Sequence, residues 1–237
     1  MDIGFSTGCF YKFCHPVSLQ AVHLAKKSGA TIIEIQAGSL ERLKKLGELD
    51  ADIFSSFKRA SLHLPGALPF RYGKNSKTVE LLDRINAEQE KFHFNAIILH
   101  PDAVDDWDIF KKYDLPILVE NMDNRKHFGK TTSDLQKVFS RFDTKMCLDV
   151  NHIFTNDKSM RLTQDFIQTF FGRISEIHIS GYKTLHDPLF KTRQNFIVDS
   201  IKGLDVPVII ESAFDDEREI TKEFFYIKNR LSGALTA

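Results

Sequence analysis

The feature that most constrains the fold is a regular alternation of short apolar runs with longer amphipathic stretches. Several runs are almost continuously apolar, such as Ile97-Ile98-Leu99 and Val208-Ile209-Ile210, as expected for strands covered on both faces. Their spacing of roughly 20–35 residues has room for one strand and one helix. Eight strands are predicted, at 3–6, 31–36, 60–64, 96–100, 116–120, 145–150, 176–180 and 206–211.

The stretches between these runs place apolar residues at three- and four-residue steps, which is typical of helices with one buried face. Helices are predicted over 17–28, 39–58 (broken near Gly47), 76–92, 104–113, 133–142, 163–171, 193–202 and 217–231. Strands that alternate with helices predict an α/β protein with a parallel sheet. Closing this sheet gives a (β/α)8 TIM barrel, and no linker or low-complexity segment divides residues 1–237, so we expect one domain.

Composition narrows the class of protein. The chain is 42% hydrophobic and 27% charged, with a formal net charge of zero, so no global field attracts nucleic acid or an anionic membrane. Cys9, Cys14 and Cys147 show no Cys-x-x-Cys spacing, which suits a reducing compartment and predicts no thiolate metal site. No secretory signal or membrane-spanning run is evident, so we expect a cytoplasmic protein without a membrane partner.

Potential metal ligands stand at the ends of the predicted strands, where a TIM barrel has its active site. Imidazole and carboxylate are the ligand types that suit zinc, manganese and iron. Any one of these residues has a simpler explanation, such as a histidine bonded to a backbone carbonyl, and Asp149-x-x-His152 is a chance-level motif. Together, eight of them predict a metal site: His63, His100, Glu120, Asp149, His152, His178, His186 and Glu211.

In the order and spacing of these motifs, the chain resembles the xylose isomerase-like TIM barrel superfamily. This superfamily includes endonuclease IV (AP endonuclease family 2) and the sugar phosphate isomerase-epimerases, and the resemblance covers essentially the whole chain. The matching motifs are His63, His100-Pro101, Glu120-Asn121, Asp149-x-x-His152, His178 and Glu211.

The resemblance implies a shared metal ion held by Glu120, Asp149, His178 and Glu211. In endonuclease-like members a neighbouring ion would be bound by His63 and His100, with Glu120 bridging. A third ion uses the His after the strand-six Asp and an Asp-x-His in the loop after strand seven. Here His152 and His186 fit, but Thr184 occupies the Asp position and Asp187 is the alternative. We therefore expect two or three divalent ions. Zinc is the expected metal, with manganese or iron as alternatives.

Phosphoester hydrolysis is the first chemistry that this site predicts, because clustered divalent ions activate water and neutralise a leaving oxygen. Glu120, Asp149 and Glu211 would be the catalytic carboxylates. The substrate would be a sugar phosphate or a phosphodiester, bound by Arg71, Arg125 and Lys183. DNA is a further candidate, gripped by the loops 71–74 and 124–126, although the neutral net charge does not favour it.

Isomerisation or epimerisation of a sugar or keto acid is the alternative. One ion would polarise the substrate while Glu120 and Glu211 shuttle a proton. The ketose-epimerase branch has a second Glu six residues after the strand-five Glu, where this chain has Lys126. That branch also has an Arg after strand seven, where this chain offers Lys183 and His186. A barrel that binds a ligand without catalysis is a third class, which the full ligand set disfavours. Glu34, which points inward on strand two, is predicted to support a ligand or the fold.

Overall fold

Eight parallel strands close into one barrel in chain order, with the first strand paired to the eighth. The computed structural model describes residues 1–66 and 71–233. The strands are β1 (Ile3–Ser6), β2 (Ile32–Gln36), β3 (Arg59–His63), β4 (Ala96–Leu99), β5 (Ile117–Glu120), β6 (Lys145–Asp149), β7 (Ile174–Ile179) and β8 (Val208–Ile210). The predicted TIM barrel is confirmed, and each strand end lies within two residues of its predicted position.

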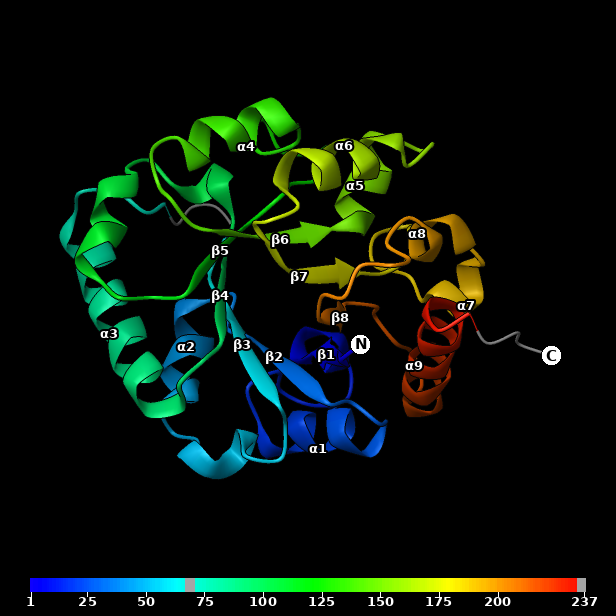
Figure 1. Ribbon diagram of the computed structural model, residues 1–237. Coiled ribbons are helices and arrows are strands. Elements are labelled where there is room, and N and C mark those ends of the chain that lie inside the picture. Colours follow the sequence, from blue (N-terminus) through cyan, green and yellow to red (C-terminus); the bar gives the residue numbers. More distant parts are fainter. Residues whose placement is uncertain (67–70, 234–237) are drawn as a thin grey trace.

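Helices form a ring around the strands (Figure 1). They are α1 (Leu19–Lys27), α2 (Leu40–Leu46), α3 (Ser76–Phe92), α4 (Thr132–Phe139), α5 (Val150–Asn156), α6 (Arg161–Phe170), α7 (Leu189–Thr192), α8 (Asn195–Asp199) and α9 (Glu217–Leu231). The break near Gly47 is confirmed, because α2 ends there and a 3-10 helix, Ala51–Phe54, follows. The predicted helix at 104–113 is a 3-10 helix, Trp107–Lys112.

Helix α5 was not predicted, because its first residue, Val150, continues the apolar run of β6. The helix begins where the strand ends because Asp149 caps it. One carboxylate oxygen of Asp149, Oδ1, accepts the backbone N–H of His152 at 2.7 Å. A side chain at the N-cap commonly satisfies a free N–H in the first turn in this way. The cap therefore gives Asp149 a structural role, whereas residue 152 contributes only its backbone N–H.

Side chains alternate between the two faces of each strand. On β4, Ile97 and Leu99 belong to the large apolar core between the barrel and the helices, whereas Ala96 and Ile98 belong to a small cluster with Leu118 and Cys147. We call these two faces the outer core and the barrel interior. At other heights the interior is polar, and its buried residues include Ser6, Glu34, Ser61, Glu176 and His178.

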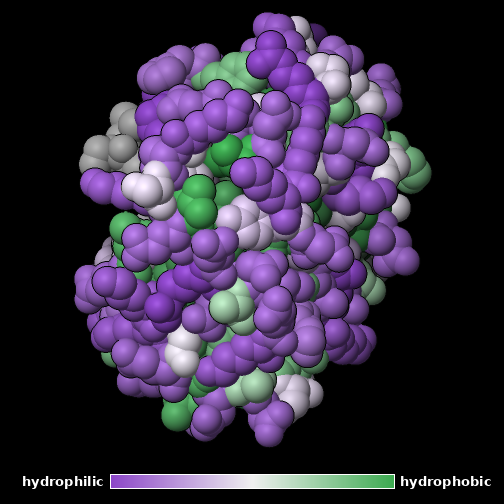
Figure 2. Space-filling view, turned by 90° about the vertical axis from the view of Figure 1, so that its left-hand side faces the viewer, coloured by the Kyte–Doolittle hydropathy of each residue, from purple (hydrophilic) through white to green (hydrophobic). Residues whose placement is uncertain are grey.

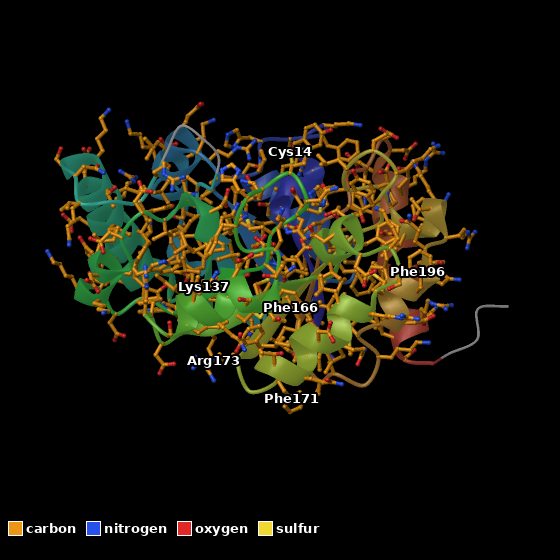
Figure 3. All side chains as sticks on the ribbon, turned by 90° about the horizontal axis from the view of Figure 1, so that it is seen from above. Cys14, Lys137, Phe166, Phe171, Arg173 and Phe196 are labelled. Carbon is orange, nitrogen blue, oxygen red and sulfur yellow. The ribbon has the colours of Figure 1, made fainter. Side chains whose placement is uncertain are left out.

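The surface is mostly hydrophilic on the face seen in Figure 2, with hydrophobic residues in small separate groups. Within residues 1–66 and 71–233, no helix is long and apolar enough to cross a membrane. Figure 3 views the barrel from the side: Cys14, after β1, and Arg173, before β7, are labelled at opposite ends of the molecule. The end that carries Cys14 is the carboxyl end of the strands, which we call the rim.

Candidate metal centre at the rim

Several overlapping groups of potential ligands come together at the rim, and two of them match the predicted metal sites. Glu120, Asp149, His178 and Glu211 offer ligand atoms within 4.8 Å of one another, and so do His63, His100 and Glu120. All six residues lie within one residue of the carboxyl end of a strand. Strand pairing contributes to their closeness, because Asp149 on β6 is in register with His178 on β7. The structure thus brings together six of the eight residues that the sequence predicts as ligands.

Glu120 belongs to both groups, and its two oxygens face different histidines. Oε1 lies 3.1 Å from Nδ1 of His178, while Oε2 lies 2.9 Å from Nε2 of His100 and 3.5 Å from Nε2 of His63. Burial opposes ionisation of Glu120, but the contacts with His100 and His178 hold its pKa well below the ordinary value. Glu120 therefore has the geometry of a bridging carboxylate.

The histidine rings are held so that one nitrogen of each faces Glu120. Nδ1 of His63 contacts the carbonyl oxygen of Leu64 at 3.0 Å, which leaves Nε2 toward Glu120. Burial lowers the pKa of His63, but the contact with Glu120 and the nearby charge of Glu34 raise it to about 9. Gly66 packs against His100, since a Cβ there would lie 2.4 Å from Nδ1 of the ring.

His178 is enclosed by carboxylates on both sides and has no exposed surface. Its Nε2 lies 3.1 Å from Oε2 of Glu34 and 3.6 Å from Oε1 of Glu176, below the rim. Burial raises the pKa of Glu34, but the contact with His178 outweighs this and lowers it. A carboxylate behind a ligating histidine sets its tautomer and strengthens it as a ligand. The structure agrees with a supporting position for Glu34.

Asp149 and Glu211 complete the first group. The side-chain amide of Asn121 anchors the backbone of Asp149: Nδ2 donates to the carbonyl oxygen, and Oδ1 accepts the backbone N–H, each at 2.8 Å. Burial raises the pKa of Asp149 to about 6 and that of Glu211 to about 8. Among the described residues, Oδ2 of Asp149 is buried without a hydrogen-bond partner. Buried carboxylates that lack partners are expensive unless a cation compensates them, so the residues present fit divalent ions.

The two remaining predicted ligands, His152 and His186, lie side by side with ring centroids 6.2 Å apart. Nδ1 of His152 contacts the carbonyl oxygen of Asn121, and Nδ1 of His186 contacts the hydroxyl of Ser180. Burial and the neighbouring His152 lower the pKa of His186 to about 4. Each histidine therefore has its Nε2 free of these contacts.

Asp187, the alternative ligand for a third ion, has another role in the structure. Its Oδ2 accepts backbone N–H groups from Lys183, Thr184 and Leu185 at 2.7, 2.7 and 3.2 Å. Backbone donors hold the pKa of Asp187 down despite partial burial. This carboxylate therefore organises its own loop, and its use as a ligand of a third ion stays a prediction.

Asp123 is a rim residue that was not predicted from the sequence. It is buried, and its Oδ2 lies 4.0 Å from Nε2 of His152. The carboxylate is already neutralised, because Arg125 donates to both of its oxygens, at 3.1 Å from Nε and 2.5 Å from Nη2. The sequence signal that could have found Asp123 is its position three residues after Glu120. It was missed because Asp123 lies in the loop after β5 rather than at the end of the strand.

The predicted substrate-binding residues separate in the structure. Lys183 lines a cavity of about 690 Å³ at the rim, together with His186 and Glu211. Arg71 instead donates to the carboxylate of Asp105 at 2.5 Å and to the carbonyl oxygen of Asp102 at 2.9 Å, and Arg125 pairs with Asp123. Neither of these arginines lines the cavity. Arg42, which was not predicted from the sequence, does.

The barrel carries a rim of carboxylates and histidines, and a xylose isomerase domain containing protein is among the solved structures of similar fold. No protein-family model and no curated protein sequence matches the chain. Among solved structures, it is similar to a D-tagatose 3-epimerase-like protein, with a TM-score of 0.71, 15% identity, and coverage of 99% of this chain and 98% of the other.

Two further solved structures show the range of proteins with this fold. Endonuclease IV from Thermus thermophilus superposes with a TM-score of 0.66 and 14% identity, over 93% of this chain and 97% of the other. A probable 3-DHS dehydratase from Bacillus anthracis superposes with a TM-score of 0.67 and 17% identity, over 97% of this chain and 100% of the other. At these identities the likeness establishes the fold, and the chemistry has to be argued from the site.

Proposed function

We propose that this chain is a metal-dependent enzyme that hydrolyses a phosphoester with two divalent ions. Zinc is the expected metal, and manganese and iron are the alternatives. The observation that carries the proposal is the orientation of Glu120, whose Oε1 lies 3.1 Å from His178 and whose Oε2 lies 2.9 Å from His100. A carboxylate between two ligand sets is what a pair of adjacent ions requires. Asp149, His178 and Glu211 would complete one site, and His63 and His100 the other.

Two ions held at this rim would supply the charge that activates a water molecule and neutralises the leaving oxygen of a phosphoester. The protein holds the ligands in place: Glu34 fixes the ring of His178, and Asn121 fixes the backbone of Asp149. Glu211 lies in the cavity wall, where its carboxylate reaches a bound substrate. The solved structures of similar fold carry enzyme names, which supports an enzyme rather than a binding protein.

The rim favours a small substrate over duplex DNA. In the segments 71–74 and 124–126, which follow β3 and β5, each of the four cations is paired: Arg71 with Asp105, Lys74 with Asp106, Arg125 with Asp123 and Lys126 with Asp102. Phosphate contacts supply most nonspecific DNA affinity, and cations already paired with carboxylates supply less of it. A cavity of about 690 Å³ is also typical of small-molecule sites.

Isomerisation or epimerisation is the second candidate. The observation that favours it is the placement of Glu120 and Glu211 in one ligand group with Glu211 open to the cavity, as a proton shuttle would require. Solved structures of similar fold include an L-ribulose 3-epimerase and a D-psicose 3-epimerase.

Metal stoichiometry and a substrate assay separate the two functions. We expect elemental analysis to give two Zn, Mn or Fe per chain, and bis-p-nitrophenyl phosphate or a sugar phosphate to be hydrolysed. A reproducible single ion would contradict the two-ion site. Incorporation of solvent deuterium into a ketose, without phosphate release from any ester, would establish the isomerase instead.

A further inference from the structure

The cavity beside Glu211 is formed by the β1, β2, β7 and β8 side of the rim, away from the paired cations of the β3 and β5 loops. Its wall carries four cationic side chains: Lys12, Arg42, Lys183 and Lys191. Two of them are neutralised. Lys12 lies 2.5 Å from Asp215, and Lys191 lies 2.7 Å from Glu219.

Arg42 and Lys183 differ from these two. Neither has a carboxylate of the described residues within the 4.0 Å of an ion pair. Asp187, the acidic residue nearest to Lys183 in the chain, has its charge taken up by three backbone N–H groups of its own loop. The cavity wall therefore has two cationic side chains that form no ion pair with a described residue.

Arg42 is held in place by a neutral partner. Its Nη1 donates to the side-chain oxygen of Gln36, the last residue of β2. Gly38 packs against this amide, since a Cβ at Gly38 would lie 2.4 Å from Nε2 of Gln36. A guanidinium fixed through one nitrogen keeps its other N–H groups for an oxyanion, and planar donation of this kind suits phosphate or carboxylate.

We propose that Arg42 and Lys183 bind a second anionic group of the substrate, a phosphate or a carboxylate, while the reacting group lies at the metal ligands beside Glu211. This inference rests on the proposed small-molecule enzyme and names its substrate class: a compound with two anionic ends. The reacting end is recognised by the metal centre and the other end by the two unpaired cations.

Binding of hydrolysis-resistant phosphonates to the metal-loaded protein tests the proposal. Calorimetry would compare bisphosphonates of increasing chain length, from propane to hexane, with the matching alkyl monophosphonates. We expect the best bisphosphonate to bind about tenfold more tightly than its monophosphonate, as expected for a charge-assisted pair. Phosphonoalkanoic acids of the same lengths form a second series, which identifies whether phosphate or carboxylate is the preferred second group.

Substitutions assign the gain to the two cations. Arg42→Gln should bring the bisphosphonate down to the affinity of the monophosphonate, Arg42→Lys should keep part of the gain, and Lys183→Gln should reduce it. Arg173→Gln is the matched control, because this guanidinium pairs with Asp143 at the opposite end of the barrel (Figure 3). Equal affinities for both ligand series at every length, or an Arg42→Gln variant that keeps the gain, would overturn the proposal.

The same titrations keep this proposal separate from the proposed function. Binding of the monophosphonate should disappear when the metal is removed with a chelator, since it reports on the metal centre. The effect of Arg42→Gln on bisphosphonate affinity reports on the cavity wall. Binding of the monophosphonate without metal would contradict the role of the metal centre. The effect of Arg42→Gln on the ratio of bisphosphonate to monophosphonate affinity would still test the role of the cavity wall.

Discussion

The two faces of the same eight strands have opposite characters. Outward side chains such as Ile97 and Leu99 pack in an extensive apolar core against the helices. Inward side chains include a small apolar cluster around Ile98 together with Ile32 and Ile209, and most of the others are polar. Several buried inward atoms lack hydrogen-bond partners within the described residues, among them Ser6 Oγ, Glu34 Oε1 and Ser61 Oγ, whereas Glu34 Oε2 faces Nε2 of His178.

Because of this difference, we expect the outer face to determine the stability of the fold and the inner face to determine metal binding. Each unpartnered buried polar group costs roughly 1–3 kcal/mol, so the interior is less stable than an apolar filling would be. The outer core offsets this cost by burying large side chains of both strands and helices. We therefore expect substitutions on the outer face to change the free energy of unfolding, and substitutions on the inner face to change metal binding.

The largest effect is expected for Glu120→Gln. The change keeps the size of the side chain but removes the charge that faces both histidine groups. We expect bound metal to fall from two ions to one or none, and turnover of the phosphoester to fall by about 10³-fold. Elemental analysis and a phosphoester assay measure both. Retention of two tightly bound ions would show that Glu120 is not the bridge.

Ile97→Ala tests the outer face. Ile97 is fully buried in the outer core, and its truncation leaves a cavity between β4 and the helices. We expect the free energy of unfolding to fall by about 2–5 kcal/mol, with metal stoichiometry unchanged. Chemical denaturation of the metal-loaded protein and elemental analysis check the two parts. Loss of metal from a folded Ile97→Ala protein would contradict the expectation that the outer face does not affect metal binding.

Glu34→Gln tests the inner face below the rim. The carboxylate of Glu34 lies 3.1 Å from Nε2 of His178, and loss of its charge weakens that ring as a ligand. We expect metal affinity to fall by about 10–100-fold without loss of thermal stability. The matched control is Glu223→Gln, a buried carboxylate on α9 that accepts N–H groups of Leu189 and Phe190. That control should lower stability and leave metal affinity unchanged, and the reverse pattern would contradict the comparison.

The smallest expected effect is a pH dependence of the metal-free protein. Glu211 has its pKa raised to about 8 by burial, and His63 has its pKa raised to about 9 by Glu120 and Glu34 against the effect of burial. In the unfolded chain both are deprotonated above about pH 6.5, so between pH 6.5 and 9 the folded state binds more protons.

Stability of the metal-free protein should therefore decrease as pH rises through this window, by on the order of 1 kcal/mol or more. The metal-loaded protein should lack this decrease, because bound cations favour the deprotonated ligands. Denaturant unfolding at pH 6.5, 7.5 and 9, with and without chelator, measures the difference. Equal slopes for both forms would contradict the assignment of Glu211 and His63 to the metal centre.

Much of the fold and part of the site could be predicted from the sequence. Strand positions follow from apolar runs, and strand ends in a parallel barrel converge, so His63, His100, Glu120, His178 and Glu211 were accessible to sequence reasoning. Arg42 was not, because it lies on a helix and reaches the cavity through a contact with Gln36. The pairing of Arg71 with Asp105 was equally hidden, since it joins loops 34 residues apart in the chain.

Asp149 has two roles, one for each of its oxygens, because Oδ1 starts α5 and Oδ2 faces the metal ligands. A barrel of this fold that had stopped binding metal would still need Asp149 to begin that helix. Asp149 would then survive because of folding rather than chemistry, whereas His152, which gives the cap only its backbone N–H, could change. A search that relied on Asp149 would gather active and inactive barrels alike, whereas under the proposed function Glu120 together with His63 and His100 would select the chains that bind two ions.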